Sequence, residues 1–290
     1  MSQSIAAYPR RFASLVKLEH TLFALPFAYV GAFLAVDGVP GAGPLAWISV
    51  AMVGARSLAM GLNRLVDAAI DARNPRTAGR ELPSGLLSRW QVFLFCLAAL
   101  ALFLVAVYQL DPLVRWLWPI PVLGFAVYPY LKRWTWLSHF WLGAVDGLAP
   151  VGAWVAISGE LPVEAWLLGA AVALWIAGFD LFYALLDLRI DREQGLHSFA
   201  TRFGEAGVFG GARALHLATV ALLTAVGLGL EVGALYWLGV AAVAGLLLYE
   251  HRLIAPGDLR GLDAAFFTVN GVLSVAFCGF VLLDVVVDLG

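Results

Sequence analysis

Two short stretches of the 290-residue sequence carry regularly spaced acidic residues that could bind a metal ion. In the first stretch, Asn63, Asp67 and Asp71 follow one another at intervals of four. Residues four apart share one face of a helix, so three oxygen-bearing side chains would form a row. Carboxylates stacked this closely repel one another unless a cation is present. Oxygen donors without His or Cys favour Mg²⁺, which commonly also takes phosphate oxygens.

Basic residues follow this first acidic row on the same loop. Pro75 cannot continue a helix, so the helix should end before it. Arg76 and Arg80 come next, and guanidinium groups match phosphate oxygens in geometry. The acids and arginines together indicate a Mg²⁺–diphosphate site. A solvated loop whose charges only set membrane topology would explain the arginines, but it explains the four-residue spacing of the acids poorly.

The second stretch repeats the pattern. Asp180, Tyr183, Asp187 and Asp191 are separated by three, four and four residues. Two acidic rows on two helices, at the same side of the protein, can hold two metal ions that a diphosphate bridges. Ionised carboxylates are costly in hydrocarbon, so both rows should face a polar cavity rather than lipid.

The elements that carry these rows are predicted to be membrane-spanning helices. The chain is 62% hydrophobic and only 13% charged, its mean hydropathy is +0.86, and runs such as 92–110 are long enough to cross a bilayer. We expect an all-α, polytopic membrane protein with a single domain over residues 1–290. About nine transmembrane helices should surround a central cavity open toward the cytoplasmic side. The expected spans are 21–37, 45–66, 91–110, 113–131, 136–157, 164–185, 212–230, 232–249 and 263–284.

The basic residues predict how the chain is oriented. Of 18 Lys and Arg, 16 lie on one side of the expected bilayer or at span ends on that side, whereas Arg115 lies on the other side and Arg56 lies inside a span. The expected location is the inner membrane. The positive-inside rule places the N-terminus and both acidic stretches on its cytoplasmic side. The net charge of −2 indicates no nucleic-acid partner. Cys96 and Cys278 match no ligand or redox spacing and should be packing residues.

The two stretches resemble the paired aspartate-rich signatures of the UbiA superfamily of intramembrane aromatic prenyltransferases. They read NRLVDAAIDARNPRTAGRELPSG at 63–85 and DLFYALLDLRIDREQGLHS at 180–198. The resemblance implies that Mg²⁺ binds an isoprenyl diphosphate, whose ionisation gives an allylic cation that an aromatic ring attacks. Where many members have Asp directly after the first Asn, this chain has Arg64. The implied metal ligands are Asn63, Asp67, Asp71, Asp187 and Asp191, and the four aspartates are the implied catalytic residues.

Further positions follow from the same resemblance. Arg76 and Tyr183 match family companions of the acidic rows, and Arg80 follows on the loop. Tyr128 and Lys132 match a Tyr-Pro-x-x-Lys element that lies near the diphosphate. These five residues are therefore expected to bind the diphosphate, although Lys132 could instead be a plain positive-inside anchor.

Three residues are candidates for binding the aromatic acceptor. Arg56 lies seven residues before Asn63, two helical turns deeper on the same face, where a charge needs a partner. It could pair with Asp146 or bind an acceptor carboxylate. His20 could contact the acceptor or the diphosphate, or be satisfied at the membrane interface. Lys17 is one of only two lysines in the chain, so it could bind the acceptor or anchor the interface.

The stretch KLEHTLFALPFAYVGAFLA at 17–35 resembles the 4-hydroxybenzoate polyprenyltransferase-like branch. The implied reaction is polyprenyl transfer to 4-hydroxybenzoate or a related aromatic acid in quinone biosynthesis. The alternative acceptor is a naphthoate for menaquinone synthesis by the futalosine route. A membrane transporter is the alternative in a different class, but the ionisable residues gather at one face rather than along a path through the membrane. The predicted partners are the two substrates and the lipid bilayer, and no protein partner is indicated.

Overall fold

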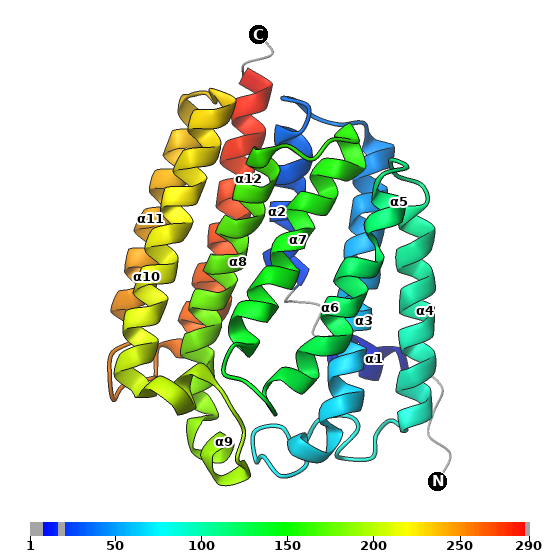
Figure 1. Cartoon of the computed structure of the whole chain (residues 1–290), viewed down its shortest axis with the longest axis vertical. Helices are drawn as coiled ribbons and strands as arrows, with labels where there is room; N and C mark the ends of the chain where they lie inside the picture. The colour runs from blue at the N-terminus through cyan, green and yellow to red at the C-terminus, as the bar shows by residue number, and fades with distance from the viewer. Residues whose placement is uncertain (1–7, 17–20, 288–290) are drawn as a thin grey trace.

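The structure is a computed structural model that describes residues 8–16 and 21–287, and these residues form helices with no strand (Figure 1). The chain order of the elements begins with α1 (Tyr8–Val16), α2 (Thr21–Leu34), α3 (Ala42–Asp71), α4 (Arg89–Val107), α5 (Val114–Leu117), α6 (Pro119–Leu131) and α7 (Ser138–Ser158). It continues with α8 (Val163–Tyr183), the 3₁₀ turn η3 (Ala184–Leu186), α9 (Leu188–Gln194), α10 (Phe199–Leu230), α11 (Ala234–Leu253), the π turn η4 (Ala264–Val269) and α12 (Asn270–Val287).

Seven helices in the described part of the chain are long and apolar enough to cross a membrane: α3, α4, α7, α8 with η3, α10, α11 and 267–287. The all-helical, polytopic fold is therefore confirmed. The other two expected spans correspond to shorter helices, because α2 has 14 residues and α6 has 13. The count of nine stays a prediction.

Two expected helix boundaries were wrong. The span expected to begin at 212 is the second part of α10, which begins at Phe199 after a capping box formed by Ser198 and Thr201. Gly204 interrupts this helix with a φ of 68°, a conformation that glycine adopts without steric cost. The span expected over 113–131 is divided into α5 and α6.

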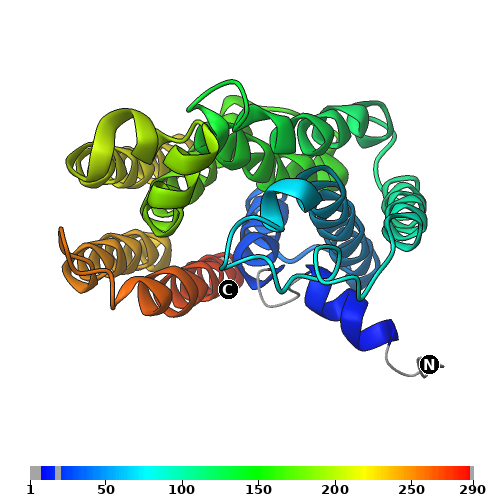
Figure 2. The same cartoon turned by 90° about the horizontal axis from the view of Figure 1, so that it is seen from below.

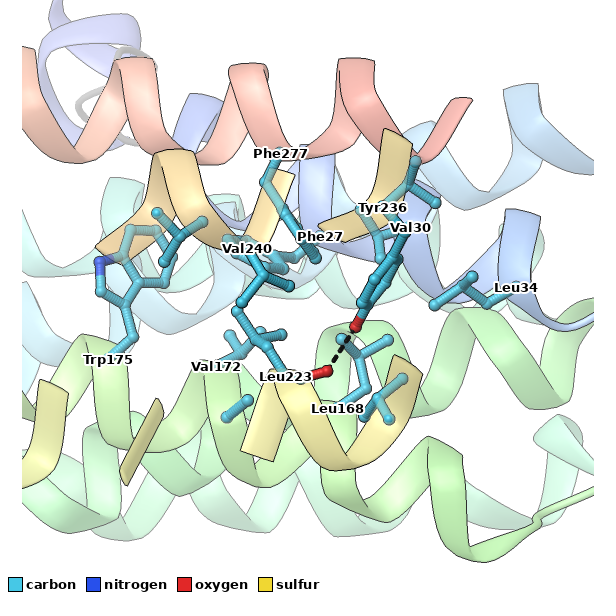
Figure 3. Close-up of a cluster of buried hydrophobic side chains, with 14 of the residues drawn as sticks. Phe27, Val30, Leu34, Leu168, Val172, Trp175, Leu223, Tyr236, Val240 and Phe277 are labelled. Carbon is cyan, nitrogen blue, oxygen red and sulfur yellow. Dashed lines mark hydrogen bonds between the residues drawn. The ribbon is translucent and has the colours of Figure 1, made fainter. Parts of the chain in front are cut away.

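The helices pack side by side around the middle of the molecule (Figure 2). Helix α8 contacts α7 and α10, α2 contacts α7 and α12, and α3 contacts α4 and α6. A buried apolar cluster joins α2, α8 and α10–α12, and within it the ring of Phe27 contacts the rings of Trp175 and Phe277 (Figure 3). Because lipid is as apolar as these side chains, close packing rather than removal from water stabilises this scaffold.

Glycines bring α7 and α8 together. A Cβ atom at Gly143 would lie 2.1 Å from the Ala173 carbonyl oxygen, and one at Gly147 would lie 2.4 Å from the Gly169 carbonyl oxygen. Small residues at these positions let the two backbones touch, as in many membrane helix pairs. As a consequence, a polar side chain at the start of α7, His139, lies within hydrogen-bonding distance of one at the end of α8, Asp180.

Candidate active site

A cavity of about 300 Å³ lies where the acidic rows end, beside the loop that joins α3 to α4 and beside α9. Its walls come from α2, α3, α6, α7 and α8. Two predicted acceptor-binding residues, Lys17 and His20, lie outside the described residues. Every other predicted site residue lines the cavity: Arg56, Asn63, Asp67, Asp71, Arg76, Arg80, Tyr128, Lys132, Tyr183, Asp187 and Asp191.

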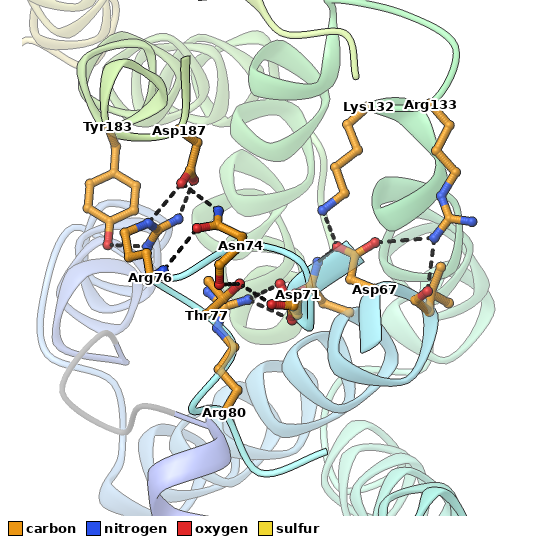
Figure 4. A network of polar contacts seen from close by, with 12 residues as sticks. Asp67, Asp71, Asn74, Arg76, Thr77, Arg80, Lys132, Arg133, Tyr183 and Asp187 are labelled. Carbon is orange, nitrogen blue, oxygen red and sulfur yellow. Dashed lines mark hydrogen bonds and ion pairs between the residues drawn. The ribbon is translucent and has the colours of Figure 1, made fainter. Parts of the chain in front are cut away.

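The first acidic row lies on the last turns of α3, as its spacing predicted. Asn63 donates a hydrogen bond of 3.2 Å from Nδ2 to Asp67 Oδ2. The other Asp67 contacts are cationic, with Lys132 Nζ at 2.5 Å and an Arg133 nitrogen at 3.4 Å. Asp71 accepts from Arg80 at 2.7 and 2.8 Å. Each carboxylate of this row is thus buried and neutralised by a basic residue (Figure 4).

The second row meets the first through the loop after α3. The Arg76 guanidinium binds both oxygens of Asp187, with 2.9 Å between Nε and Oδ1, and donates to the Tyr183 hydroxyl at 3.2 Å. Asn74 Nδ2 donates to Asp187 Oδ1 at 2.9 Å, while its own Oδ1 accepts from the Arg76 backbone. The predicted approach of the two stretches is therefore present (Figure 4).

The two acids of the second row differ in their pKa values. Burial alone would raise the pKa of Asp187, but the hydrogen bonds and charge of Arg76 outweigh burial and lower this pKa below its usual range. The same contact raises the pKa of Arg76 although burial opposes it. Burial and then the nearby charge of Asp187 raise the pKa of Asp191 to about 6. A cation beside Asp191 would favour its ionised form.

The oxygen donors of both rows fit a magnesium ion in kind. In the described ranges, no three His, Cys, Asp or Glu side chains already converge as a metal site, because the carboxylates point to lysine and arginine instead. Lys132, Arg76 and Arg80 are also the cations expected to bind a diphosphate. A metal–diphosphate complex could therefore enter between acids and bases, with the acids contacting metal and the bases contacting phosphate.

Sequence reasoning missed several cavity residues. Arg64 is buried, and its Nε has no hydrogen-bond partner among the described residues; its only signal was that it replaces an expected acid. Asn74 bridges the two stretches, and its position three residues after Asp71 could have indicated a role. Asp180 was already named in the second stretch, but its partner His139, at 2.6 Å, was missed because nothing in the sequence relates two residues that lie on different helices.

Residues 24–272 match the sequence model of the UbiA prenyltransferase family. The chain belongs to this family. It is 33% identical over 278 residues to a 4-hydroxybenzoate octaprenyltransferase of Aliivibrio fischeri, covering 94% of this chain and 93% of that protein. A Vibrio cholerae protein of the same name is 33% identical, with 95% and 94% covered.

Solved structures of family members have the same fold. A UbiA homologue from Aeropyrum pernix superposes with a TM-score of 0.80 at 31% identity, covering 94% of this chain and 98% of that chain. A homologue from Archaeoglobus fulgidus, bound to DMAPP and Mg²⁺, superposes with a TM-score of 0.74 at 20% identity, covering 96% and 99%. This UbiA family member is thus an all-helical protein with the acidic rows of a prenyltransferase.

Proposed function

We propose that this UbiA family member transfers a polyprenyl group from an isoprenyl diphosphate to 4-hydroxybenzoate, or to a related aromatic acid, in quinone biosynthesis. The observation that carries the proposal is one cavity in which two acidic rows and three cations, Arg76, Arg80 and Lys132, meet. Family membership and the names of the relatives support a prenyl transfer reaction.

The cations of the cavity suit the first half of such a reaction. When the allylic C–O bond breaks, negative charge develops on the departing diphosphate, and donors fixed in advance stabilise it. Arg76 and Arg80 would bind its oxygens in forked geometry, and Lys132 would add a point charge. Tyr128 and Tyr183 line the same space and can donate from their hydroxyls. Mg²⁺, when held by Asn63, Asp67, Asp71, Asp187 and Asp191, supplies Lewis-acid stabilisation of the leaving group.

Apolar walls suit the second half of the reaction, in which the aromatic ring attacks the allylic cation. Phe125, Leu142, Ile176 and Phe179 line the cavity beyond the acidic rows. An allylic cation must be kept from water until the aromatic ring attacks it, and aromatic ring faces can stabilise it in passing. The same walls would accept the prenyl chain.

Arg56 is the proposed partner of the acceptor's carboxylate. It lies about 10 Å deeper than Asn63, given the 1.5 Å rise over seven residues. Its Nε is buried without a hydrogen-bond partner in the described part of the chain. No ion pair shorter than 4 Å joins it to Asp146 within the described residues, although the two charges act on each other. An aromatic acid could fill this gap. Lys17 and His20 stay predicted acceptor-binding residues.

The proposed location is the inner membrane, with the N-terminus and both acidic stretches in the cytoplasm. The asymmetry of the basic residues supports it. Cysteines introduced at the exposed residues Ser84 and Glu193, in a background without Cys96 and Cys278, test it. Neither should react with an impermeant thiol reagent added to intact cells, whereas both should react in inverted vesicles. Labelling from outside would contradict the orientation.

Prenyl transfer itself is tested with purified protein in detergent. The protein should convert geranyl diphosphate and 4-hydroxybenzoate into a prenylated acid when Mg²⁺ is present, as followed by mass spectrometry. A parallel reaction with 1,4-dihydroxy-2-naphthoate tests the naphthoate alternative. Transfer to neither acceptor, with no release of diphosphate from the allylic donor, would contradict the proposed function.

A further inference from the structure

His139 and Asp180 form a buried pair that the reaction above does not use. His139 lies in the first turn of α7 and Asp180 in the last turn of α8, and both line the cavity. His139 Nδ1 lies 2.6 Å from Asp180 Oδ2. The contact of Gly143 with α8, one turn from His139, holds the two helices at this distance. The pair is therefore built into the helix packing rather than into a mobile loop.

Two polar atoms of this pair have no hydrogen-bond partner among the described residues. His139 is only 8% exposed, and its Nε2 is buried with no hydrogen-bond partner among the described residues. Nδ1 is therefore the nitrogen that donates, and Asp180 Oδ2 accepts. The Asp180 side chain keeps 15% of its surface exposed in the cavity, and its Oδ1 accepts no hydrogen bond from any described residue. One carboxylate oxygen is fixed by histidine, and the other is free for a ligand.

The place of Asp180 in the cavity relates it to the acceptor rather than to the metal. Although it begins the second stretch, Asp180 is not among the implied metal ligands, and it lies seven residues before Asp187, just as Arg56 lies seven residues before Asn63. Both therefore stand about two helical turns deeper than the implied metal ligands. The charge of Asp180 acts on Tyr128 and Asp146, which places these groups around the same deep part of the cavity. An aromatic acid whose carboxylate binds Arg56 would present its ring and hydroxyl to this level.

We propose that Asp180 is a catalytic residue that accepts the proton of the acceptor's hydroxyl group, and that His139 is its positioning residue. The proposal rests on the proposed function, because it needs a hydroxylated aromatic acceptor. A carboxylate beside the hydroxyl makes the ring a better nucleophile, and general-base assistance of this kind contributes roughly 10²–10⁴-fold in rate. The hydrogen bond with His139 Nδ1 fixes the orientation of the carboxylate.

The allylic C–O bond breaks and its electron pair leaves with the diphosphate. The hydroxyl O–H pair becomes the C=O π bond as its proton moves to Asp180 Oδ1, and a ring π pair forms the new C–C bond. The product of this step is a neutral dienone. Its ring C–H proton then passes to the departing diphosphate, that electron pair restores the aromatic ring, and the oxygen regains its proton from Asp180.

Two acceptors and three variants test the assignment. The acceptors are 4-hydroxybenzoate and 3-fluoro-4-hydroxybenzoate, whose hydroxyl ionises more readily. Asp180→Asn still accepts a hydrogen bond from His139, so it should fold, which a thermal melt in detergent checks. We expect its kcat with 4-hydroxybenzoate to fall at least about 100-fold while KM for geranyl diphosphate is unchanged. Fluorine lowers the pKa of the acceptor's hydroxyl group. With the fluorinated acceptor, the difference in kcat between Asp180→Asn and the wild type should therefore shrink by about tenfold for each unit by which that pKa falls.

The histidine variants separate positioning from packing. His139→Leu removes the donor and should lower kcat by about tenfold, as expected for a lost hydrogen bond to a charged group. His139→Asn retains an N–H near the place of Nδ1 and should restore most of kcat. Loss of kcat in both histidine variants alike, or equal loss in Asp180→Asn with both acceptors, would overturn the assignment.

The same measurements distinguish this inference from the proposed function. Wild-type protein that transfers a prenyl group, together with a fully active Asp180→Asn variant, would overturn the role of Asp180 alone. Wild-type protein that transfers no prenyl group to either hydroxybenzoate would overturn the proposed acceptor and the role of Asp180 together.

Discussion

The two acidic rows share a spacing but differ in how the backbone holds them. The first row lies on one continuous helix, α3, and the side chains of Asp67 and Asp71 are only 2% and 6% exposed. The second row is interrupted by the 3₁₀ turn η3, and Asp187 stands between helices with 20% of its side chain exposed. A continuous helix surrounded by packed side chains fixes its ligands, whereas a short 3₁₀ segment between helices can adjust.

The rows also differ in the charge that lies below them. Arg56 is two turns deeper than Asn63 on α3, and Asp180, on α8, is two turns deeper than Asp187. The same spacing therefore places a cation on the α3 wall of the cavity and an anion on the α8 wall. Together with the cations that reach from the loop after α3, this suits a charged diphosphate at the mouth and an aromatic acid further in.

Removal of the metal should have the largest effect, because it disables both rows at once. Excess EDTA should reduce prenyl transfer to background, since departure of the diphosphate needs its charge neutralised. Adding back Mg²⁺ beyond the chelator should restore the rate, which mass spectrometry of the prenylated product measures. Full turnover in excess EDTA would contradict a metal role for either row.

Lengthening one acid in each row should reveal the difference in rigidity. Asp67→Glu places an extra methylene in a buried, packed position. Overpacking of this kind costs about 1–3 kcal/mol, and the displaced carboxylate also loses its geometry toward the metal. We therefore expect kcat to fall at least about 100-fold. Asp187→Glu lies on the adjustable segment and should lose only about tenfold by the same conversion. Steady-state kinetics with geranyl diphosphate measures both.

The alanine variants serve as the reference for this comparison. Asp67→Ala and Asp187→Ala should each lose several orders of magnitude while the protein stays folded, because both acids are expected to bind metal. If the two glutamate variants lose activity equally, the second row is as rigid as the first, and the contrast between the rows is wrong.

Much of this arrangement could be predicted from the sequence, because local spacing decides it. Period-four acids, a helix that ends before Pro75 and a lysine four residues after Tyr128 are all properties of single helices. The His139–Asp180 pair could not be predicted, since it depends on the close approach of α7 to α8 at Gly143. The early start of α10 was missed as well, because the polar segment 199–211 carries no long apolar run, although it is helical on both sides of the kink at Gly204.

Loss of Arg56 should affect one substrate more than the other. If Arg56 binds the acceptor's carboxylate, Arg56→Leu should raise the acceptor's KM by about 10–100-fold, the effect of a lost hydrogen bond to a charged group. The donor's KM, measured with geranyl diphosphate, should change little, because that substrate binds at the level of the acidic rows. Kinetics with each substrate varied in turn measures the split.

A thermal melt in detergent gives the control for Arg56. If its role is to neutralise Asp146, Arg56→Leu should instead destabilise the protein by leaving a buried acid unpaired. Arg56→Leu combined with Asp146→Leu should then recover stability. Normal kinetics and a normal melt in Arg56→Leu would reject both roles.

The smallest effect should come from pH, and it should be confined to the second row. Asp191 has a pKa raised to about 6 by burial and by the charge of Asp187, so it is mainly ionised at pH 7.5 and mainly protonated at pH 5.5. A metal ion must displace that proton, so the affinity for Mg²⁺ should fall by up to about tenfold per pH unit below 6. Calorimetric titration of Mg²⁺ at several pH values measures this.

Two variants are the controls for the pH dependence. Asp191→Asn should bind Mg²⁺ more weakly at pH 7.5, and its Mg²⁺ affinity should show no inflection near pH 6. Asp187→Asn removes one cause of the raised pKa of Asp191, so its inflection should move to lower pH. An affinity that is constant from pH 7.5 to 5.5 in the wild-type protein would show that Asp191 does not bind the metal.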